Sequence, residues 1–554
     1  MGSTLRIVNG RVYDPANDVD GKTRDICIKD GKIVKSVPPK TKCIDAKGMV
    51  VMPGGVDIHC HIAGAKANIA RKLQPDDHRR DVHHRLDLKK INTRSGTGGT
   101  VPSTFTTGYR YATMGYTTAM EAAVPPLLAR HTLDEFDDTP VIDKGFYILM
   151  GNNVLLYQML QEGRHEEIRN AVAWWLNATK SYTTKLVNPG GDEPWKGHRN
   201  ATITQLNDKI DGYEQLTPRK IITSMVNTVE DLGLPHPVHI HCNNLGHSGN
   251  YKTTLETMKA TGGRRIHITH IQFHSYGGKP NENPTSKAPQ IAEYINNNPN
   301  ITADVGQVMF GRSTSMTADA PLAWMLTRYS NDKRWVNADT ECESGCGIIP
   351  FAYQEQVYTH ALQWAIGLEL FLLSKDPWRM VLSTDHPNGG TFTSYPRLIR
   401  TLMDREFRKQ QMDSVNQKAV AKIKRGHHME REYTLQEIAI VTRAGPARIL
   451  GLKNKGHLGP GADADITIYD EHEDKELMFS APRYVLKSGH LIIDNHEFRN
   501  NHEGKILHVA PGYDEGIKDV IRPFVEDFYT IKFDNYAVSD NYIPHHEVVP
   551  TAKQ

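Results

Sequence analysis

Residues 50–61 constrain the fold of this chain more than any other stretch. An apolar run closed by proline and glycine is followed by a second short apolar run, which ends in His59 and His61. Short apolar runs bounded in this way are typical of buried strands. Because side chains alternate along a strand, the two histidines leave it on the same side. Two neutral imidazoles so placed can bind one metal ion such as zinc, although a pair of histidines in a surface loop would show the same motif.

A repeated order of strand, loop and helix follows, up to about residue 455. Further apolar strands are predicted at 117–123, 146–150, 183–187, 238–242, 266–271, 301–305 and 380–384. Helices are predicted between them, among others at 165–179, 217–232, 251–260 and 288–296. With the strand before His59 the strands number eight, so residues 53–455 are predicted to form an α/β fold, a (β/α)8 barrel of the TIM type.

Two stretches interrupt this alternation, at about 63–112 and 310–375. Both follow the carboxyl end of a predicted strand, which is the face where barrels of this kind carry their active sites. We therefore expect both stretches to be insertions that bind substrate. The alternative is that they only pack against neighbouring subunits.

The two ends of the chain show a different pattern, with short period-two strands separated by Asn-Gly and Asp-Gly turns. The pattern covers residues 1–52 and recurs over 456–500. It predicts a small composite β-sandwich domain assembled from both ends, with residues 501–554 as a C-terminal extension.

Composition excludes several functional classes. The 66 lysines and arginines nearly balance the 64 acidic residues, and no block of like charge suggests a nucleic-acid partner. No apolar stretch is long enough to span a membrane, so we predict no membrane association. The six cysteines are scattered, which favours the reducing cytoplasm and offers no spacing for an iron-sulfur centre.

Lys185 lies inside an otherwise apolar predicted strand. A buried lysine is costly unless it is paired, neutral or chemically changed. Reaction of the amine with CO2 would give a carbamate whose two oxygens can bridge two metal ions. The alternative is a salt bridge with an aspartate or glutamate.

Histidines and an aspartate mark three later strand ends. The fifth strand offers His239 and His241, and the sixth offers His267 and His270. The position nearer the carboxyl end is favoured in each case, His241 and His270, but the residues alone do not settle the choice. Asp385 follows the eighth strand, where a carboxylate can bind metal and act as a base for water.

The order of these residues, a His-x-His pair followed by a lysine, two histidines and an aspartate at successive strand ends, resembles the amidohydrolase superfamily. Residues 442–469 resemble that family's return from the barrel into its β domain. A closer likeness is to the A subunits of formylmethanofuran dehydrogenases and of the formyltransferase/hydrolase complexes of methylotrophs, and it is carried by residues 58–71, 75–79, 185–191, 270–277 and 384–390.

The resemblance implies a binuclear zinc centre with Asp385 as the catalytic base. The implied metal ligands are His59 and His61 on one Zn2+, carboxylated Lys185 (N6-carboxylysine) bridging, His241 and His270 on the second Zn2+, and Asp385. The implied substrate is the N-formyl amide of an aminomethylfuran cofactor, methanofuran or methofuran. The implied reaction, part of one-carbon metabolism, is its hydrolysis to formate and the free amine, or the reverse condensation.

Residues that could bind the cofactor lie near these ligands in the sequence. The candidates are Lys66, Asn68, Asn243 and His274. An acidic cofactor tail could also meet the basic residues of the first insertion, unless that insertion is merely a solvated loop; these residues are Lys66, Arg71, Arg79 and Arg80.

The implied partners are the other components of a multisubunit complex. They would include a formyltransferase if the reaction is hydrolytic, or proteins carrying molybdenum or tungsten and iron-sulfur clusters if the complex is a dehydrogenase. Two alternatives remain open. One is a cyclic-amide hydrolase of the dihydropyrimidinase or dihydroorotase type, and the other is a non-catalytic scaffold within such a complex.

Overall fold

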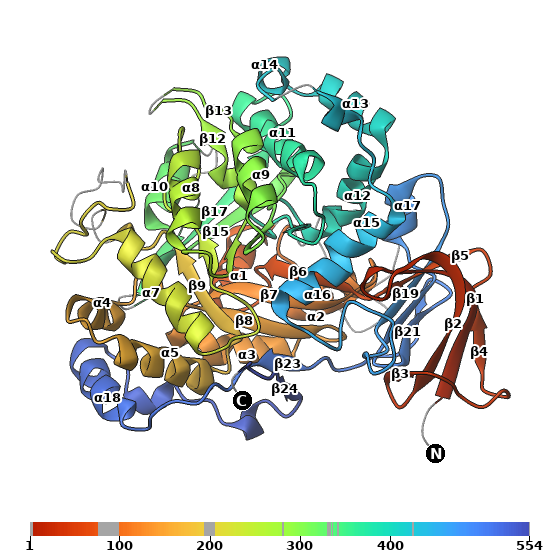
Figure 1. Ribbon diagram of the computed structural model, residues 1–554, viewed down its shortest axis with the longest axis horizontal. Coiled ribbons are helices and arrows are strands. Elements are labelled where there is room, and N and C mark those ends of the chain that lie inside the picture. The colour runs from red at the N-terminus through yellow and green to blue at the C-terminus, as the bar shows by residue number, and fades with distance from the viewer. Residues whose placement is uncertain are drawn as a thin grey trace.

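The computed structural model describes residues 4–75, 99–192, 195, 205–279, 282–329, 334, 336–340, 343–423 and 426–552. A barrel of parallel strands lies at its centre (Figure 1). In pairing order these strands are β6 (Gly55–Cys60), β7 (Tyr116–Val124), β8 (Asp143–Leu149), β9 (Thr183–Val187), β10 (His239–His241), β11 (Ile266–Ile268), β14 (Ile301–Asp304) and β18 (Met380–Val381). A parallel bridge between Cys60 and His386 joins the first strand to the segment after the last. The predicted TIM-like α/β barrel is confirmed.

Helices follow the barrel strands, and most of them cover the outside of the barrel (Figure 1). In the first half they are α1 (Ala65–Leu73), α2 (Thr104–Ala112), α3 (Ala129–Asp137), α4 (Val154–Gln161), α5 (His165–Thr179) and α7 (Pro218–Asp231). In the second half they are α8 (Tyr251–Ala260), α9 (Ala288–Asn297), α10 (Ala320–Tyr329), α11 (Tyr358–Leu373), α12 (Tyr395–Met403), α13 (Arg405–Ser414), α14 (Gln417–Val420), α15 (Leu435–Ala439) and α16 (Gly445–Leu450). Helices α1 and α10 instead pack against a small sheet within residues 311–353.

Local chemistry explains where these helices begin. At α7, the Thr217 side chain accepts a hydrogen bond from the Lys220 amide, and Pro218 fills the first helical position. The apolar residues that follow face the barrel and are buried. Helices α5 and α8 have the bounds predicted from their apolar periodicity.

A nine-stranded sheet beside the barrel combines strands from both parts of the chain, as predicted for a composite β domain (Figure 1). The N-terminal strands are β1 (Thr4–Asp14), β2 (Val19–Lys29), β3 (Lys32–Val34), β4 (Cys43–Asp45) and β5 (Met49–Pro53). The later strands are β19 (Ile466–Asp470), β20 (Tyr484–Lys487), β21 (His490–Asp494) and β22 (Glu497–Phe498), with α17 (Lys475–Ser480) after β19. Antiparallel pairing of β5 with β19 joins the two sets.

The C-terminal extension adds strands to the barrel sheet. Strand β23 (Ile506–His508) pairs with the first residues of β8, and β24 (His546–Val548) pairs with β23. Helix α18 (Ile517–Phe528) lies against α5. The tail therefore packs on the end of the barrel opposite the carboxyl ends of its strands.

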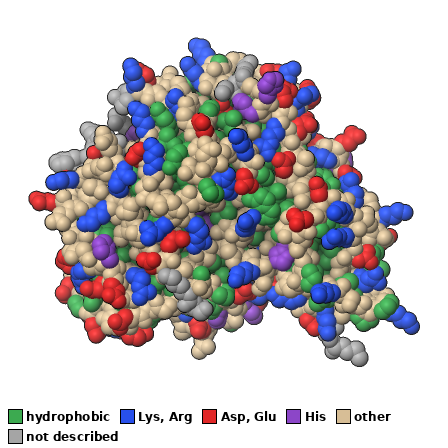
Figure 2. All heavy atoms as spheres, viewed as in Figure 1, with side chains coloured by type: hydrophobic (Ala, Val, Ile, Leu, Met, Phe, Trp, Pro, Cys, Tyr) green, Lys and Arg blue, Asp and Glu red, His purple; other side chains and the backbone are tan. Residues whose placement is uncertain are grey.

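The described parts of the two predicted insertions follow the carboxyl ends of β6 and β14, and residues 358–373 of the second form helix α11, which packs against α9. The second one contains a three-stranded sheet of β15 (Gly311–Thr317), β17 (Glu343–Tyr353) and β16 (Val336–Thr340), and it is preceded by the pair β12 (Tyr276–Gly277) and β13 (Thr285–Ser286). Within the described part of the chain, no helix is both long and apolar enough to cross a membrane. Figure 2 shows basic and acidic side chains interspersed over the face in view.

Candidate metal centre

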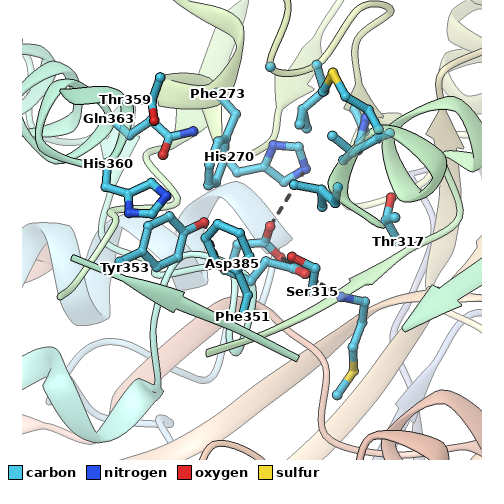
Figure 3. Close-up of a pocket in the computed structure, with 18 of the residues that line it drawn as sticks. His270, Phe273, Ser315, Thr317, Phe351, Tyr353, Thr359, His360, Gln363 and Asp385 are labelled. Carbon is cyan, nitrogen blue, oxygen red and sulfur yellow. Dashed lines mark hydrogen bonds and ion pairs between the residues drawn. The ribbon is translucent and has the colours of Figure 1, made fainter. Parts of the chain in front are cut away.

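One cavity of about 1030 Å³ opens at the carboxyl ends of the barrel strands, and all six predicted ligand residues line it. They are His59, His61, Lys185, His241, His270 and Asp385. Figure 3 shows two of them, His270 and Asp385, pointing into this cavity from opposite sides. Side chains that are far apart in the sequence are thus brought together at one site.

The first group of candidate ligands is His59, His61 and Asp385, whose ligand atoms lie within 4.8 Å of one another. Asp385 Oδ1 lies 3.0 Å from His59 Nε2 and 3.2 Å from His61 Nε2. The other ring nitrogen of His61, Nδ1, lies 3.0 Å from Glu121 Oε1. A ligand histidine held from behind by a carboxylate is the usual arrangement in metal sites, because the partner fixes the ring and its tautomer.

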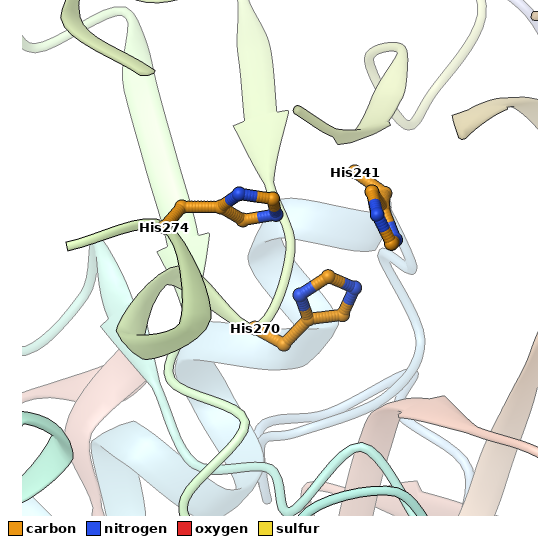
Figure 4. A group of neighbouring side chains, drawn as sticks. All are labelled: His241, His270 and His274. Carbon is orange, nitrogen blue, oxygen red and sulfur yellow. The ribbon is translucent and has the colours of Figure 1, made fainter. Parts of the chain in front are cut away.

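The second group is His241, His270 and His274, again with ligand atoms within 4.8 Å of one another (Figure 4). His241 Nε2 lies 3.2 Å from Asp319 Oδ2. His274 follows His270 by one turn, in the short helix η5 (Ile271–His274), and its ring stacks on that of His270. Burial lowers the pKa of all three rings, so they are neutral and able to bind metal.

Lys185 lies on β9, lines the same cavity and is buried. Among the described residues, nothing forms a hydrogen bond with its Nζ. Burial lowers its pKa to about 7. A sizeable fraction of the amine is therefore neutral near pH 7, and the neutral amine is the form that reacts with CO2. The alternative of a structural salt bridge receives no support from this geometry.

Three residues at the strand ends adopt positive φ angles. These are Asn188 at 42°, His270 at 34° and Asp385 at 51°. This region is costly for residues other than glycine, and such strain concentrates at functional sites. Here it turns the chain sharply at the rim. Asp385 is further held by Asn388, whose side-chain amide donates to Oδ1 at 2.9 Å.

The structure places at different depths the four histidines between which the sequence does not choose. His241 and His270 line the cavity, whereas His239 and His267 lie deeper in the barrel and are fully buried. His239 is hydrogen-bonded to His59, and His267 is hydrogen-bonded to Asp304. The geometry favours His241 and His270 as the metal ligands.

None of the four candidates for cofactor binding is among the residues that line this cavity, and His274 lies beside His241 and His270. Lys66 pairs with Glu121 at 2.6 Å, and Asn68 bonds Arg71 at 2.8 Å. Asn243 donates to Asn188 at 2.9 Å. Burial alone would raise the pKa of the Glu121 carboxyl group. Lys66 and His61 outweigh this effect and lower the pKa to about 2. A cofactor-binding role for these candidates stays a prediction, and Arg79 and Arg80 lie outside the described residues.

Several cavity residues carry no motif that sequence reasoning could single out. They are aromatic or basic and include Phe273, Arg312, Phe351, Tyr353 and His360. Most of them lie in the stretch 310–375, where only a general substrate-binding insertion was predicted. In Figure 3, Phe351 and Tyr353 lie beside Asp385, and His360 lies on the far side of Tyr353. The sequence does show that this insertion follows a strand end, which points to a substrate-binding region. It does not show which residues of the insertion reach the cavity.

Comparison with known proteins decides the family. Residues 42–493 match the amidohydrolase family. The chain belongs to this family. Over 97% of its length it is 44% identical to Protein FwdA of Methanocaldococcus jannaschii and 38% identical to the A subunit of the formyltransferase/hydrolase complex Fhc of Methylorubrum extorquens, and it covers 97% of each of these relatives.

The crystal structure of the formyltransferase/hydrolase complex of Methylorubrum extorquens with methylofuran contains a chain that superimposes on this amidohydrolase with a TM-score of 0.91. The match covers 99% of this chain and 100% of the other at 37% identity. The predicted family and the prediction of a hydrolase are thereby confirmed.

The donor set of this amidohydrolase fits a pair of metal ions. Imidazole and carboxylate donors are those that zinc prefers. Buried ring nitrogens and one amine have no hydrogen-bond partner among the described residues, namely His59 Nε2, Lys185 Nζ and His270 Nδ1. Polar atoms left in this way are costly unless something binds them, because burial removes their water.

Proposed function

We propose that this amidohydrolase cleaves the N-formyl amide of an aminomethylfuran cofactor, of the methanofuran or methofuran type, to formate and the free amine. The observation that carries the proposal is the convergence of all six predicted ligands on one cavity, in a chain that aligns over nearly its whole length with the A subunit of the Fhc complex. The same site would catalyse the reverse condensation in a complex that operates in that direction.

In this proposal two zinc ions are held by the two groups of side chains. His59 and His61 would hold one ion, His241 and His270 would hold the other, and Lys185, carboxylated at Nζ, would be a ligand shared by the two. When bound, the ions supply Lewis-acid polarisation of the amide carbonyl and make water acidic enough to lose a proton near neutral pH.

Asp385 moves the protons in the proposed hydrolysis. It accepts a proton from the attacking water and delivers it to the amide nitrogen, which must be protonated to leave as an amine. One water is consumed, the C–N bond breaks, and formate and the amine are released. Asp385 lines the cavity, where its carboxylate can meet both the water and the amide nitrogen.

The aromatic wall of the cavity suits a flat heterocycle. Phe351 and Tyr353 pack edge to face at 5.1 Å, and His360 contacts both rings. Aromatic side chains bury large apolar areas and favour stacked or edge contacts with other rings. We propose that this wall takes the furan ring and so directs the formyl group towards Asp385.

We also propose that the protein works in a multisubunit complex in the cytoplasm. The structural relative is one chain of the FhcABCD complex, whose crystal structure contains methylofuran, and the present chain aligns with it over 99% of its length. A formyltransferase partner would indicate the hydrolytic direction, whereas partners with molybdenum or tungsten and iron-sulfur clusters would indicate the dehydrogenase. Cys27, Cys43, Cys60 and Cys242 are free thiols, as a reducing compartment favours.

The decisive experiment combines elemental analysis of the purified protein with a formate-release assay on a formylated aminomethylfuran cofactor. We expect about two zinc ions per chain, as in two-metal hydrolases, together with formate release. Metal without formate release, but with hydrolysis of hydantoin or dihydrouracil, would favour the cyclic-amide hydrolase. A protein that binds no metal would favour the scaffold.

A further inference from the structure

Three histidines form one hydrogen-bonded line beneath the cavity. His59 Nδ1 lies 2.9 Å from His239 Nε2, and His239 Nδ1 lies 3.0 Å from His236 Nε2. At the far end, His236 Nδ1 lies 3.0 Å from the carbonyl oxygen of Ile449. All three rings are buried, with at most 1% of their surface exposed. The line therefore runs from a candidate metal ligand to the end of helix α16.

The carbonyl group sets the direction of every hydrogen bond in this line. A carbonyl oxygen only accepts, so Nδ1 of His236 carries the hydrogen. A neutral imidazole has one N–H, so Nε2 of His236 accepts from His239, and Nε2 of His239 accepts from Nδ1 of His59. The remaining nitrogen, His59 Nε2, then holds a lone pair and faces the cavity.

A lone pair at this position explains an otherwise unfavourable contact. His59 Nε2 lies 3.0 Å from Asp385 Oδ1, yet it forms no hydrogen bond among the described residues. Two acceptors that face each other at this distance repel unless a cation binds both. The arrangement suits a metal ion and does not suit a protonated Nε2.

Packing holds the line in place. The Tyr147 ring stacks on His236 at 5.3 Å and contacts His239 at 4.6 Å. The Ile449 carbonyl is available because the last carbonyls of a helix have no partner within it. The Thr269 hydroxyl is also within hydrogen-bond reach of His59 Nδ1 and can accept the same hydrogen.

We propose that His239 and His236 are positioning residues that fix His59 as the Nδ1–H tautomer and so present its Nε2 lone pair to the metal centre. The inference rests on the metal site of the proposed function. A proton relay is ruled out by the end of the line, because a backbone carbonyl neither donates nor passes on a proton.

The test compares zinc affinity, by competition with a chelator, in His239→Leu and in a matched control, His267→Leu. His267 is fully buried, is paired with His239 across the two strands and stacks on its ring at 4.6 Å, but it bonds Thr302 and Asp304 instead of the line. We expect His239→Leu to lower zinc affinity about 10–100-fold, the usual effect of losing a partner of a ligand histidine. The zinc affinity of His267→Leu should stay close to that of the unchanged protein.

His239→Gln sharpens the test, because its amide can accept from one neighbour and donate to the other as the imidazole does. We expect it to recover part of the lost affinity. Equal losses in the two leucine variants, or no loss in His239→Leu, would overturn the proposal. If His239→Leu does not fold, His236→Leu breaks the same line one residue further from the cavity.

A second measurement needs neither metal nor activity. In metal-free protein labelled with 15N at histidine, the ring signals that are lost in His59→Ala should report a hydrogen on Nδ1 and a lone pair on Nε2. The His239→Leu variant should give a mixture of both tautomers. A hydrogen on Nε2 in the unchanged protein would overturn this inference, whereas the expected tautomer without formate release would overturn only the proposed function.

Discussion

Two buried clusters of charged residues lie at opposite ends of the barrel, and the pKa of the buried lysine is lowered in one and raised in the other. At the carboxyl ends of the strands, Lys185 has no hydrogen-bond partner among the described residues, and burial lowers its pKa to about 7. At the other end, burial alone would lower the pKa of Lys455, but Asp143, Asp465 and Asp463 raise it well above its usual range. Burial is the same in both clusters, so the number of carboxylates decides whether the amine is reactive or permanently charged.

We call the second cluster the ionic cluster; it comprises Asp143, Lys455, Asp463, Asp465 and Lys487. Lys455 Nζ lies 2.9 Å from Asp463 and 3.0 Å from Asp465, and Lys487 Nζ lies 2.7 Å from Asp465. The three aspartates form a group that could hold a metal ion, but three ammonium groups, those of Lys455, Lys487 and Lys32, already pair with them. The cluster joins the start of β8 to the β domain.

The largest expected effect is the loss of metal in Lys185→Met. Without an amine there is no carbamate bridge, so we expect at least one zinc ion per chain to be lost and formate release to fall to background. The unfolding free energy of the metal-free protein should hardly fall, because no carboxylate loses a partner. Elemental analysis and urea unfolding check both points, and unchanged zinc content would contradict the bridge.

Asp385→Asn should lower turnover by about 10²–10⁴-fold, the usual contribution of a general acid–base group. Zinc should be retained in large part, because the histidines and Lys185 remain. Steady-state formate release and metal content of the same preparation measure the two outcomes. Near-normal turnover would remove Asp385 from the proposed proton transfer.

Lys455→Met should lower the free energy of unfolding by about 3–5 kcal/mol, because buried carboxylates are left without their cation. The control is Lys518→Met, which breaks an exposed pair with Glu515 and should cost about 0–1 kcal/mol. Urea unfolding of both variants separates the values. A small loss in Lys455→Met would mean that the ionic cluster does not hold the domains together.

The smallest expected effect is on the pH dependence of stability, to which the two ends of the barrel should contribute in different pH ranges. Burial, together with nearby His61, lowers the pKa of His386 to about 3. The contribution of neutral His386 to stability is therefore fully present above about pH 6.5 and is lost as the pH falls towards 3. At the other end of the barrel, burial alone would raise the pKa of Asp463, but Lys455 and Lys32 outweigh this effect and lower the pKa to about 2. Its contribution is present above about pH 4 and is lost as the pH falls through 2.

The free energy of unfolding, measured from pH 7 to 2, should therefore fall in two separate pH ranges. His386→Gln should flatten the upper range and Asp463→Asn the lower one. If either variant flattens both ranges, the two ends of the barrel do not titrate separately.

Local patterns in the sequence predicted the barrel and its ligands because strands and their ends are local features. His59, His270 and Asp385 each follow or end an apolar run, Lys185 lies within one, and parallel strands bring their carboxyl ends to one face. The ionic cluster could not be predicted in this way. Asp143 and Lys455 lie far apart in the sequence, and neither belongs to a periodic pattern that points to the other.

The histidine line was missed for a related reason. His239 was weighed only as an alternative ligand to His241, because both are histidines of one short strand. Its actual partners, His59 and His236, are set by side-chain packing across the barrel interior. The aromatic wall likewise depends on how the second insertion folds back over the barrel.

The sheet that combines both parts of the chain has a consequence for synthesis on the ribosome. Strand β5 pairs with β19, which is made more than 400 residues later. At a translation rate of about 5–20 residues per second, the first strands wait about 20–80 s for these partners. During that time β5 presents an open apolar edge, which is a ready template for pairing with another nascent chain. Cells that produce this protein therefore have reason to shield its first 60 residues while the barrel is being made.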